Sequence, residues 1–216
     1  MLDITEQIAN CGVIPIGVVN TVDDGLRLCE ALLAGGLNVI EITFRTEAAA
    51  DTIAAIKQRF PDILLGAGTL IRVDDVRKAR EAGAVFGVSP GLNPEVLQEA
   101  QRVGLEFFPG VCTPTDVEHA LKYGAKILKF FPAEAAGGVK MLKALWGPYG
   151  HLGLSFCPTG GISGSNMSDY LKLPGVIAVG GSWLSSPKLF GEWSKITRLA
   201  QEAVQTASMI RSKGEG

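Results

Sequence analysis

Short apolar runs recur at regular intervals along the chain, and each has the length of a β-strand. The helical spacing of apolar residues predicts helices between most of these runs. Several predicted helices end at a glycine, which suits the left-handed residue that stops a helix. The predicted strands are Val13–Val19, Leu37–Thr43, Ile63–Ala67, Val85–Ser89, Leu105–Pro109, Lys126–Phe130, Leu154–Pro158 and Val176–Gly180, and the predicted helices are Asp23–Ala34, Glu47–Phe60, Val73–Ala82, Pro94–Val103, Pro114–Tyr123 and Val139–Trp146.

The apolar runs are nearly continuous rather than alternating, which is typical of parallel strands buried on both faces. Eight such strands alternating with helices predict an α/β fold, a single (β/α)8 TIM barrel. We expect one domain over residues 1–216, with a short N-terminal helix, a C-terminal helix at Lys188–Arg211 and a frayed tail at Ser212–Gly216. An open doubly wound sheet is the main alternative, but no G-x-G-x-x-G follows the first strand.

The composition agrees with a large buried core and argues against nucleic acid and membranes as binding partners. Hydrophobic residues make up 47% of the 216 residues, and 20 basic against 22 acidic residues leave a formal net charge of -2. This balance predicts no surface for nucleic acid. No apolar run reaches the roughly 18 residues of a membrane helix, and Asp3 and Glu6 stand where a secretory signal would be basic. We therefore expect a cytoplasmic protein without nucleic-acid or membrane partners.

The cysteines and histidines do not have the spacing of metal ligands. Cys11, Cys29, Cys112 and Cys157 lie far apart without a C-x-x-C motif, and they predict reduced thiols. The two histidines belong to no cluster of ligand residues. We therefore expect no metal and no cofactor.

A lysine at the carboxyl end of the sixth predicted strand is a candidate for catalysis. Lys129 lies between an apolar run and Phe130-Phe131-Pro132. Apolar surroundings remove the hydration of an ammonium and so favour the neutral amine, which attacks carbonyl carbon in Schiff-base enzymes. The alternative is a structural lysine whose ammonium reaches solvent at the strand end.

Further polar residues stand at the ends of other predicted strands, where a barrel carries its chemistry. Glu41 and Arg45 share one side of an extended chain, because Arg45 follows Glu41 by four positions and every second residue of such a chain points the same way. A carboxylate in an apolar strand is costly unless it is paired or used, so Glu41 is either a catalytic acid/base or part of a structural ion pair. Thr69, after the third strand, places a hydroxyl beside the same cavity.

The loops after the last two predicted strands are rich in glycine and poor in charge. Residues 144–168 and 173–187 contain no Asp, Glu, Lys or Arg. An anion here would be held by backbone N–H groups, hydroxyls and helix N-termini. Barrel enzymes often bind phosphate in these two loops, so Thr159-Gly160-Gly161 and Gly180-Gly181-Ser182 predict a phosphate site. The alternative for each glycine pair is a simple turn.

Together these segments resemble the class I 2-keto-3-deoxy-6-phosphogluconate (KDPG) and 4-hydroxy-2-oxoglutarate (KHG) aldolase family. They follow the order of the predicted strands and are consistent with one pocket. A sister group that acts on the 6-phosphogalactonate epimer resembles the chain less, and Cys112 stands where the family is expected to have serine. The matching segments are Glu41–Glu47, Gly66–Thr69, Ser89–Gly91, Phe108–Gly110, Lys129–Glu134, Cys157–Ser163 and Gly180–Trp183.

The resemblance implies a role for each candidate. Lys129 forms the Schiff base with the C2 ketone, and Glu41 is the general acid/base, acting through a water. Arg45 and Thr69 bind the carboxylate of the pyruvate half. The apolar wall of the pocket is assigned to Pro90 and Phe131, and the phosphate to Thr159, Gly160, Gly161, Gly180, Gly181 and Ser182.

The resemblance also implies the substrates, the products and the assembly. Cleavage of KDPG, a phosphorylated 2-keto acid, gives pyruvate and glyceraldehyde 3-phosphate, and cleavage of KHG gives pyruvate and glyoxylate. No cofactor is implied, and the family is typically homotrimeric. The preference between phosphorylated and unphosphorylated substrates, the stereochemistry at C4 and the pathway served stay open at this point.

Two other functions fit the same residues. A phosphosugar isomerase or epimerase would use Glu41 as a proton-abstracting base and Lys129 as an electrostatic partner, while a non-catalytic sugar-phosphate binder would merely pair the two. A metal-dependent aldolase is disfavoured by the lack of clustered histidines. Reduction with borohydride in the presence of pyruvate separates these functions, because only a Schiff-base enzyme gains a covalent adduct.

Overall fold

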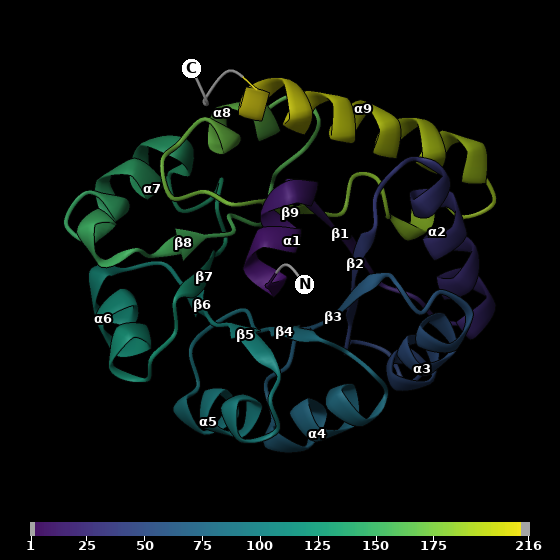
Figure 1. Ribbon diagram of the computed structural model, residues 1–216, viewed down its shortest axis with the longest axis horizontal. Helices are drawn as coiled ribbons and strands as arrows, with labels where there is room; N and C mark the ends of the chain where they lie inside the picture. The colour runs from purple at the N-terminus through teal and green to yellow at the C-terminus, as the bar shows by residue number, and fades with distance from the viewer. Residues whose placement is uncertain (1–2, 213–216) are drawn as a thin grey trace.

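The computed structural model describes residues 3–212, in which parallel strands are surrounded by helices (Figure 1). The strands are β1 (Val13–Gly17), β2 (Val39–Thr43), β3 (Leu64–Gly68), β4 (Phe86–Val88), β5 (Glu106–Phe108), β6 (Gly110–Val111), β7 (Ile127–Phe130), β8 (Ser155–Phe156) and β9 (Val179–Gly181). The helices are α1 (Ile4–Cys11), α2 (Val22–Ala34), α3 (Ala49–Arg59), α4 (Val73–Glu81), α5 (Pro94–Arg102), α6 (Pro114–Lys122), α7 (Gly138–Trp146), α8 (Met167–Leu171) and α9 (Trp193–Ser212), with short 3-10 helices η1 (Gly150–Leu152) and η2 (Pro187–Leu189).

The expected single closed barrel of eight strands is wrong, because the strands pair in two separate sheets. One is a six-stranded parallel sheet in the order β5-β4-β3-β2-β1-β9, and the other is a three-stranded sheet in the order β6-β7-β8. Prolines stand at both interruptions: Pro109 separates β5 from β6, and Pro158 follows β8. A proline has no N–H to donate to a ladder. Isolated bridges, such as the one between Thr159 and Gly180, link the two sheets at the second interruption.

The α/β class is confirmed, and most predicted helices lie within two residues of the observed ones. Helix α8 was not predicted from the sequence, because five residues are too few to show a helical period. The C-terminal helix starts later than predicted, since Pro187–Leu189 forms η2 and Phe190 is extended before α9 starts. Of the predicted tail, Ser212 is the last residue of α9, and residues 213–216 lie outside the described part of the chain.

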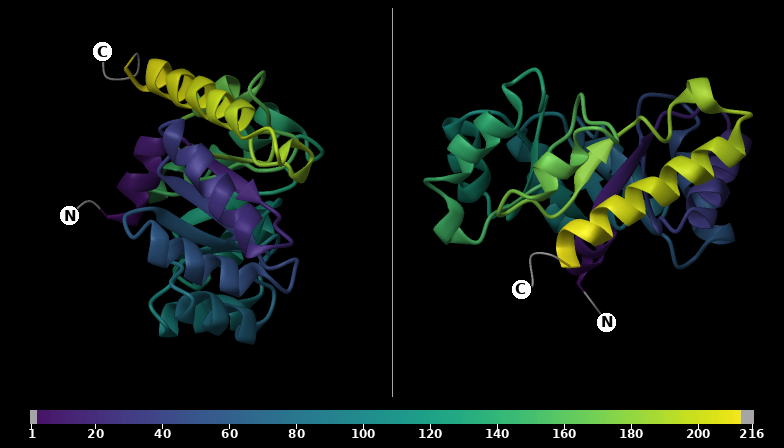
Figure 2. Two further views of the ribbon diagram at one scale, coloured as in Figure 1. Left: turned by 90° about the vertical axis from the view of Figure 1, so that its right-hand side faces the viewer. Right: turned by 90° about the horizontal axis from the view of Figure 1, so that it is seen from above.

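The long helix α9 lies along one side of the molecule next to α2 (Figure 2). The two helices come close at Gly35, where a Cβ would lie 2.7 Å from the backbone oxygen of Thr197. The Thr197 hydroxyl donates a 3.0 Å hydrogen bond to the backbone oxygen of Ala31 in α2. Within residues 3–212, none of the helices combines the length and apolar composition that a membrane span requires.

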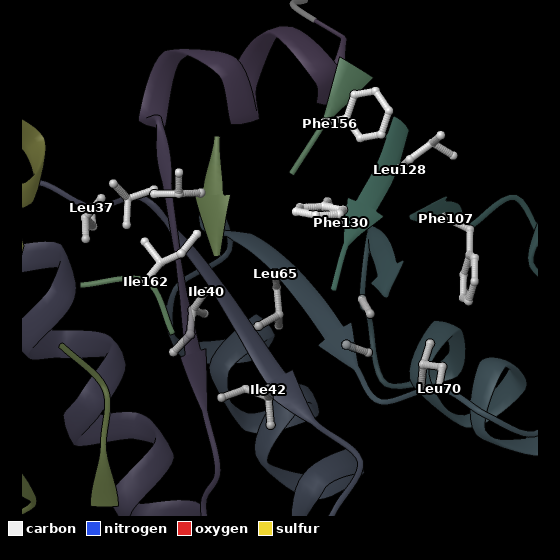
Figure 3. Close-up of a cluster of buried hydrophobic side chains, with 14 of the residues drawn as sticks. Leu37, Ile40, Ile42, Leu65, Leu70, Phe107, Leu128, Phe130, Phe156 and Ile162 are labelled. Atoms are coloured by element: carbon white, nitrogen blue, oxygen red, sulfur yellow. The ribbon is translucent and has the colours of Figure 1, made fainter. Parts of the chain in front are cut away.

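Apolar side chains form two core layers, because successive residues of a strand point to opposite faces. The larger layer lies between the strands and the surrounding helices and includes Ile40, Ile42 and Leu128 (Figure 3). The smaller layer lies on the inner face and includes Val39 of β2, Ile127 of β7 and Ile8 of α1. Two residues beyond Val39 and Ile127 on the same inner face stand Glu41 and Lys129. The inner core layer therefore lies directly below the polar candidate residues, which stand at the carboxyl ends of the strands.

Candidate active site

A cavity of about 300 Å³ opens at the carboxyl ends of the strands, between the two sheets. Residues from β1, β2 and β9 reach it from one sheet, and residues from β7 and the loop after β8 reach it from the other. All of the site residues predicted from the sequence line this cavity except Gly180. Those that line it are Glu41, Arg45, Thr69, Pro90, Lys129, Phe131, Thr159, Gly160, Gly161, Gly181 and Ser182.

Gly180 lies beside the cavity wall and makes room for a neighbour. Its backbone bridges to Thr159, and its N–H donates a 2.9 Å hydrogen bond to the backbone oxygen of Pro158. A Cβ at this position would lie 3.2 Å from Cδ1 of Ile16 and would collide with the Thr159 hydroxyl. The missing side chain of Gly180 thus leaves the space that the Thr159 side chain needs.

Several cavity residues were missed by sequence analysis. Thr43 lies between Glu41 and Arg45 on the same side of the strand, so the alternation of side chains along β2 was sufficient to place it at the site. Its hydroxyl is buried and has no hydrogen-bond partner among the described residues. The other missed residues carry no such signal, because they are apolar or stand in loops. They are Ile16, Val18, Ile162, Ser186 and Pro187.

Glu41 is a nearly buried carboxyl group, with only 3% of its surface exposed. Burial raises the pKa of Glu41 above its ordinary value of 4.5, and the positive charge of Lys129 opposes this effect without cancelling it. Among residues 3–212, none of the ion pairs includes Glu41 or Lys129. The structural ion pair considered from the sequence is therefore not formed, and the carboxyl group faces the cavity.

Lys129 is also buried, with 7% of its surface exposed, so its side chain does not extend into bulk solvent. Its backbone N–H donates a 2.9 Å hydrogen bond to the oxygen of Pro109, which ties β7 to the neighbouring strand. The Nζ atom lies 5.3 Å from the centre of the Phe131 ring. At this distance a cation is attracted by the face of an aromatic ring. The amine is thus held inside the cavity next to an apolar wall.

Arg45 and Thr69 bring polar groups to the cavity mouth. Arg45 is exposed, and none of the ion pairs or hydrogen bonds within the described chain engages its guanidinium. Thr69 has a φ of +59°, which is rare for a β-branched residue. The next residue is held in place, since the Leu70 N–H donates a 3.1 Å hydrogen bond to the oxygen of Val88. Such local strain is typical of functional sites.

The glycine turn after β8 presents unpaired N–H groups. Gly160 and Gly161 have φ values of +102° and +79°. The oxygens of Thr159 and Gly160 accept hydrogen bonds of 2.8 and 3.0 Å from the N–H groups of Ala133 and Glu134. A planar trans peptide directs its N–H away from its C=O, so the N–H groups of both glycines point away from this segment. Within residues 3–212 they have no acceptor, and a concavity of such groups binds anions.

The cavity therefore combines an amine, a carboxyl group, a guanidinium and an uncharged anion cradle. An amine and a carboxyl group that do not neutralise each other can perform nucleophilic and acid/base catalysis on a carbonyl compound. The guanidinium and the cradle can hold two anionic groups of one ligand. Within the described chain, no group of three His, Cys, Asp or Glu side chains is arranged to hold a metal ion.

Comparison with known proteins gives one consistent result. The chain matches the family model described as KDPG and KHG aldolase over residues 4–199. The 2-dehydro-3-deoxy-phosphogluconate aldolase of Treponema pallidum is 41% identical over 212 residues, which cover 97% of this chain and 100% of that protein. The KHG/KDPG aldolase of Escherichia coli K12 is 42% identical over 207 residues, covering 94% and 96% of the two chains.

A solved structure shares both the fold and the sequence. The KDPG aldolase of Legionella pneumophila, crystallised with pyruvate captured at low pH as a covalent carbinolamine intermediate, superposes with a TM-score of 0.89. It is 40% identical to this chain, and the match covers 94% of this chain and 98% of that one.

Proposed function

The chain belongs to the KDPG and KHG aldolase family, and we propose that Lys129 and Glu41 carry the catalytic chemistry of this enzyme. It is a class I lyase that cleaves KDPG to pyruvate and glyceraldehyde 3-phosphate, and KHG to pyruvate and glyoxylate. The observation that carries the assignment of the two residues is their common burial in one cavity without an ion pair between them. A relative that holds pyruvate as a carbinolamine supports the covalent route.

The reaction begins when the neutral amine of Lys129 attacks C2 of the substrate ketone to give a carbinolamine. Protonation of its hydroxyl and loss of water then give an iminium ion. The electron pair of the C3–C4 bond moves into the iminium as that bond breaks, and the C4 hydroxyl loses its proton as it becomes the aldehyde. Protonation of the enamine at C3 and hydrolysis of the resulting iminium release pyruvate and the free amine.

Glu41 is the proposed carrier of these protons, through a water. It accepts the proton of the C4 hydroxyl during cleavage and supplies protons for dehydration and for the enamine carbon. Its raised pKa suits this task, because a carboxyl group that titrates closer to neutrality both holds and releases a proton under working conditions. Burial is the larger cause of the raised pKa, so the buried position of Glu41 on the inner face contributes to its proposed acid/base function.

The remaining cavity residues are proposed to bind the two ends of the substrate. Arg45 and Thr69 hold the carboxylate of the pyruvate half, since a guanidinium donates two parallel hydrogen bonds to a carboxylate. Pro90 and Phe131 form the apolar wall beside the reacting carbons. The phosphate is assigned to the residues that surround the open cradle, namely Thr159, Gly160, Gly161, Gly181 and Ser182, with Gly180 supporting Thr159.

We also propose that the chain folds as one domain, assembles as a homotrimer and works in the cytoplasm. The family resemblance supports the trimer, and light scattering of the purified protein tests it. A mass of three chains is expected, and a stable monomer with full turnover would contradict the trimer.

Reductive trapping tests the central assignment. Incubation with pyruvate and borohydride should add the mass of one reduced pyruvate per chain, and peptide mapping should find it on Lys129. The Lys129→Ala variant should gain no adduct and lose turnover, whereas Lys126→Ala, which removes an exposed lysine just before β7, should keep both. An isomerase would gain no mass, and an adduct on another lysine would reassign the nucleophile.

A further inference from the structure

Helix α8 carries a buried polar contact that the proposed reaction does not use. Tyr170 is fully buried, and its hydroxyl donates a short hydrogen bond to Oε1 of Glu134. Burial and this hydrogen bond both raise the pKa of Tyr170, so its hydroxyl keeps the proton that it donates. Glu134 stands in the loop that follows β7, five residues beyond Lys129. The contact therefore joins α8 to the segment that leaves the catalytic strand.

Glu134 in turn touches both glycines of the turn after β8, which belongs to the proposed phosphate cradle. Its backbone N–H donates a 3.0 Å hydrogen bond to the oxygen of Gly160. A Cβ built on Gly161 would lie 2.6 Å from Cβ of Glu134, so the side chain packs directly against this glycine. When the C=O of Gly160 is held by Glu134, the N–H of Gly161 in the same peptide is fixed in the opposite direction.

The start of α8 holds the same turn from its other end. Asn166, which precedes the helix, donates a 3.2 Å hydrogen bond from its side-chain amide to the oxygen of Gly161. Its side-chain oxygen accepts a 2.8 Å hydrogen bond from the N–H of Ser163. Two residues of the α8 segment, Asn166 and Tyr170, thus act on the glycine turn, one directly and one through Glu134.

We propose that Tyr170 and Glu134 are positioning residues that keep the N–H groups of the Gly160-Gly161 turn directed at the substrate phosphate. This inference rests on the proposed function, because it assigns a device for recognising the phosphorylated substrate at the same site. The proposal predicts an effect on one substrate only. KHG has no phosphate, and its C5 carboxylate ends the molecule before the carbon that carries phosphate in KDPG. The contact between Tyr170 and Glu134 should therefore affect binding of KDPG but not of KHG.

Steady-state kinetics of Tyr170→Phe with both substrates test the proposal. Loss of the hydrogen bond from Tyr170 to Glu134 should raise KM for KDPG about tenfold, with kcat changed by about twofold or less. Both parameters for KHG should stay close to those of the parent enzyme. A matched control is Tyr149→Phe, which removes the 3.0 Å hydrogen bond from another tyrosine to Glu118 away from the cavity and should change neither substrate.

Variants of Glu134, which accepts the hydrogen bond from Tyr170, show whether this pair positions the glycine turn or only fills space. Glu134→Gln keeps an oxygen that accepts from Tyr170 and should retain most of the affinity for KDPG, whereas Glu134→Ala should lose it as Tyr170→Phe does. Should Tyr170→Phe fail to fold, Asn166→Ala removes the donor to Gly161 without disturbing a fully buried side chain, and the same KDPG-specific rise in KM is expected.

Two results would overturn the proposal. A parallel loss of activity with KDPG and KHG would make the contact merely structural, and unchanged kinetics with both substrates would show that the turn keeps its geometry without it. Failure of the proposed function is distinguishable, because the parent enzyme itself would then release no pyruvate from either substrate and trap no pyruvate on Lys129.

Discussion

Gly68 leaves open the space that the carboxyl group of Glu41 occupies. The two residues stand on the paired strands β3 and β2, and a Cβ built on Gly68 would lie 2.6 Å from the carboxyl carbon of Glu41. Carbon atoms in contact prefer a separation of about 3.5 to 4.0 Å. The glycine is thus required for the observed position of the proposed acid/base group, although it has no side chain that could take part in the chemistry.

The Gly68→Ala variant is expected to fold and to lose turnover. The added methyl group meets the end of a flexible side chain, so Glu41 moves aside while the fold is kept. Because acid/base catalysis depends on exact placement, kcat should fall about tenfold or more, with little change in KM. Gly91→Ala is the control, since a Cβ at that position meets nothing within 4 Å. Unchanged turnover in Gly68→Ala would show that Glu41 does not act from its observed position.

The Glu41→Gln variant should be inactive but more stable than the parent protein at about pH 8. Burial raises the pKa of Glu41 in the folded state, so the group stabilises the fold fully below its unfolded pKa. That contribution is lost as pH rises through the raised folded pKa, because the buried carboxylate must then be charged. A neutral amide avoids this cost, so its melting temperature should be higher at alkaline pH.

Thermal unfolding monitored by circular dichroism measures this effect. The increase in melting temperature caused by Glu41→Gln should shrink as the pH falls and vanish at about pH 3, where Glu41 is protonated in both the folded and the unfolded state. The exposed Glu202→Gln variant on α9 is the control. A lower melting temperature of Glu41→Gln at alkaline pH would mean that the attraction of Lys129 outweighs burial.

The Arg45→Lys variant should weaken binding of both substrates. KDPG and KHG share the carboxylate of the pyruvate half, and an ammonium cannot donate the two parallel hydrogen bonds of a guanidinium. We expect KM to rise about tenfold for each, with a smaller change in kcat. Arg72→Lys, at an exposed position that does not line the cavity, should leave both values unchanged. A KM effect on KDPG alone would instead place Arg45 at the phosphate.

Dialysis against EDTA should leave turnover intact. In the proposed mechanism, the iminium on Lys129 accepts the electrons of the breaking bond, which is the task of the metal ion in metal-dependent aldolases. The measurement is pyruvate release before and after chelation. Loss of activity that a divalent cation restores would contradict the Schiff-base assignment.

Much of the site was predictable because the necessary information is local. The alternation of residues along β2 placed Glu41 and Arg45 on one face, and Thr43 lies between them on that face. The charge-free glycine segments indicated where a phosphate would be held without cations. By contrast, Ser186 and Pro187 reach the cavity through an irregular loop, whose path no periodic pattern describes.

The alternation of most strands and helices, the inner-face positions along β2 and the segments shared with the aldolase family were determined by the amino-acid sequence alone. These features depend on spacing within one segment or on its chemistry. The tertiary structure decided the division of the strands into two sheets, the fit of Glu41 over Gly68 and the contact of Tyr170 with Glu134. Each of these depends on atoms from different segments meeting in space, and such contacts arise only when the whole chain has packed.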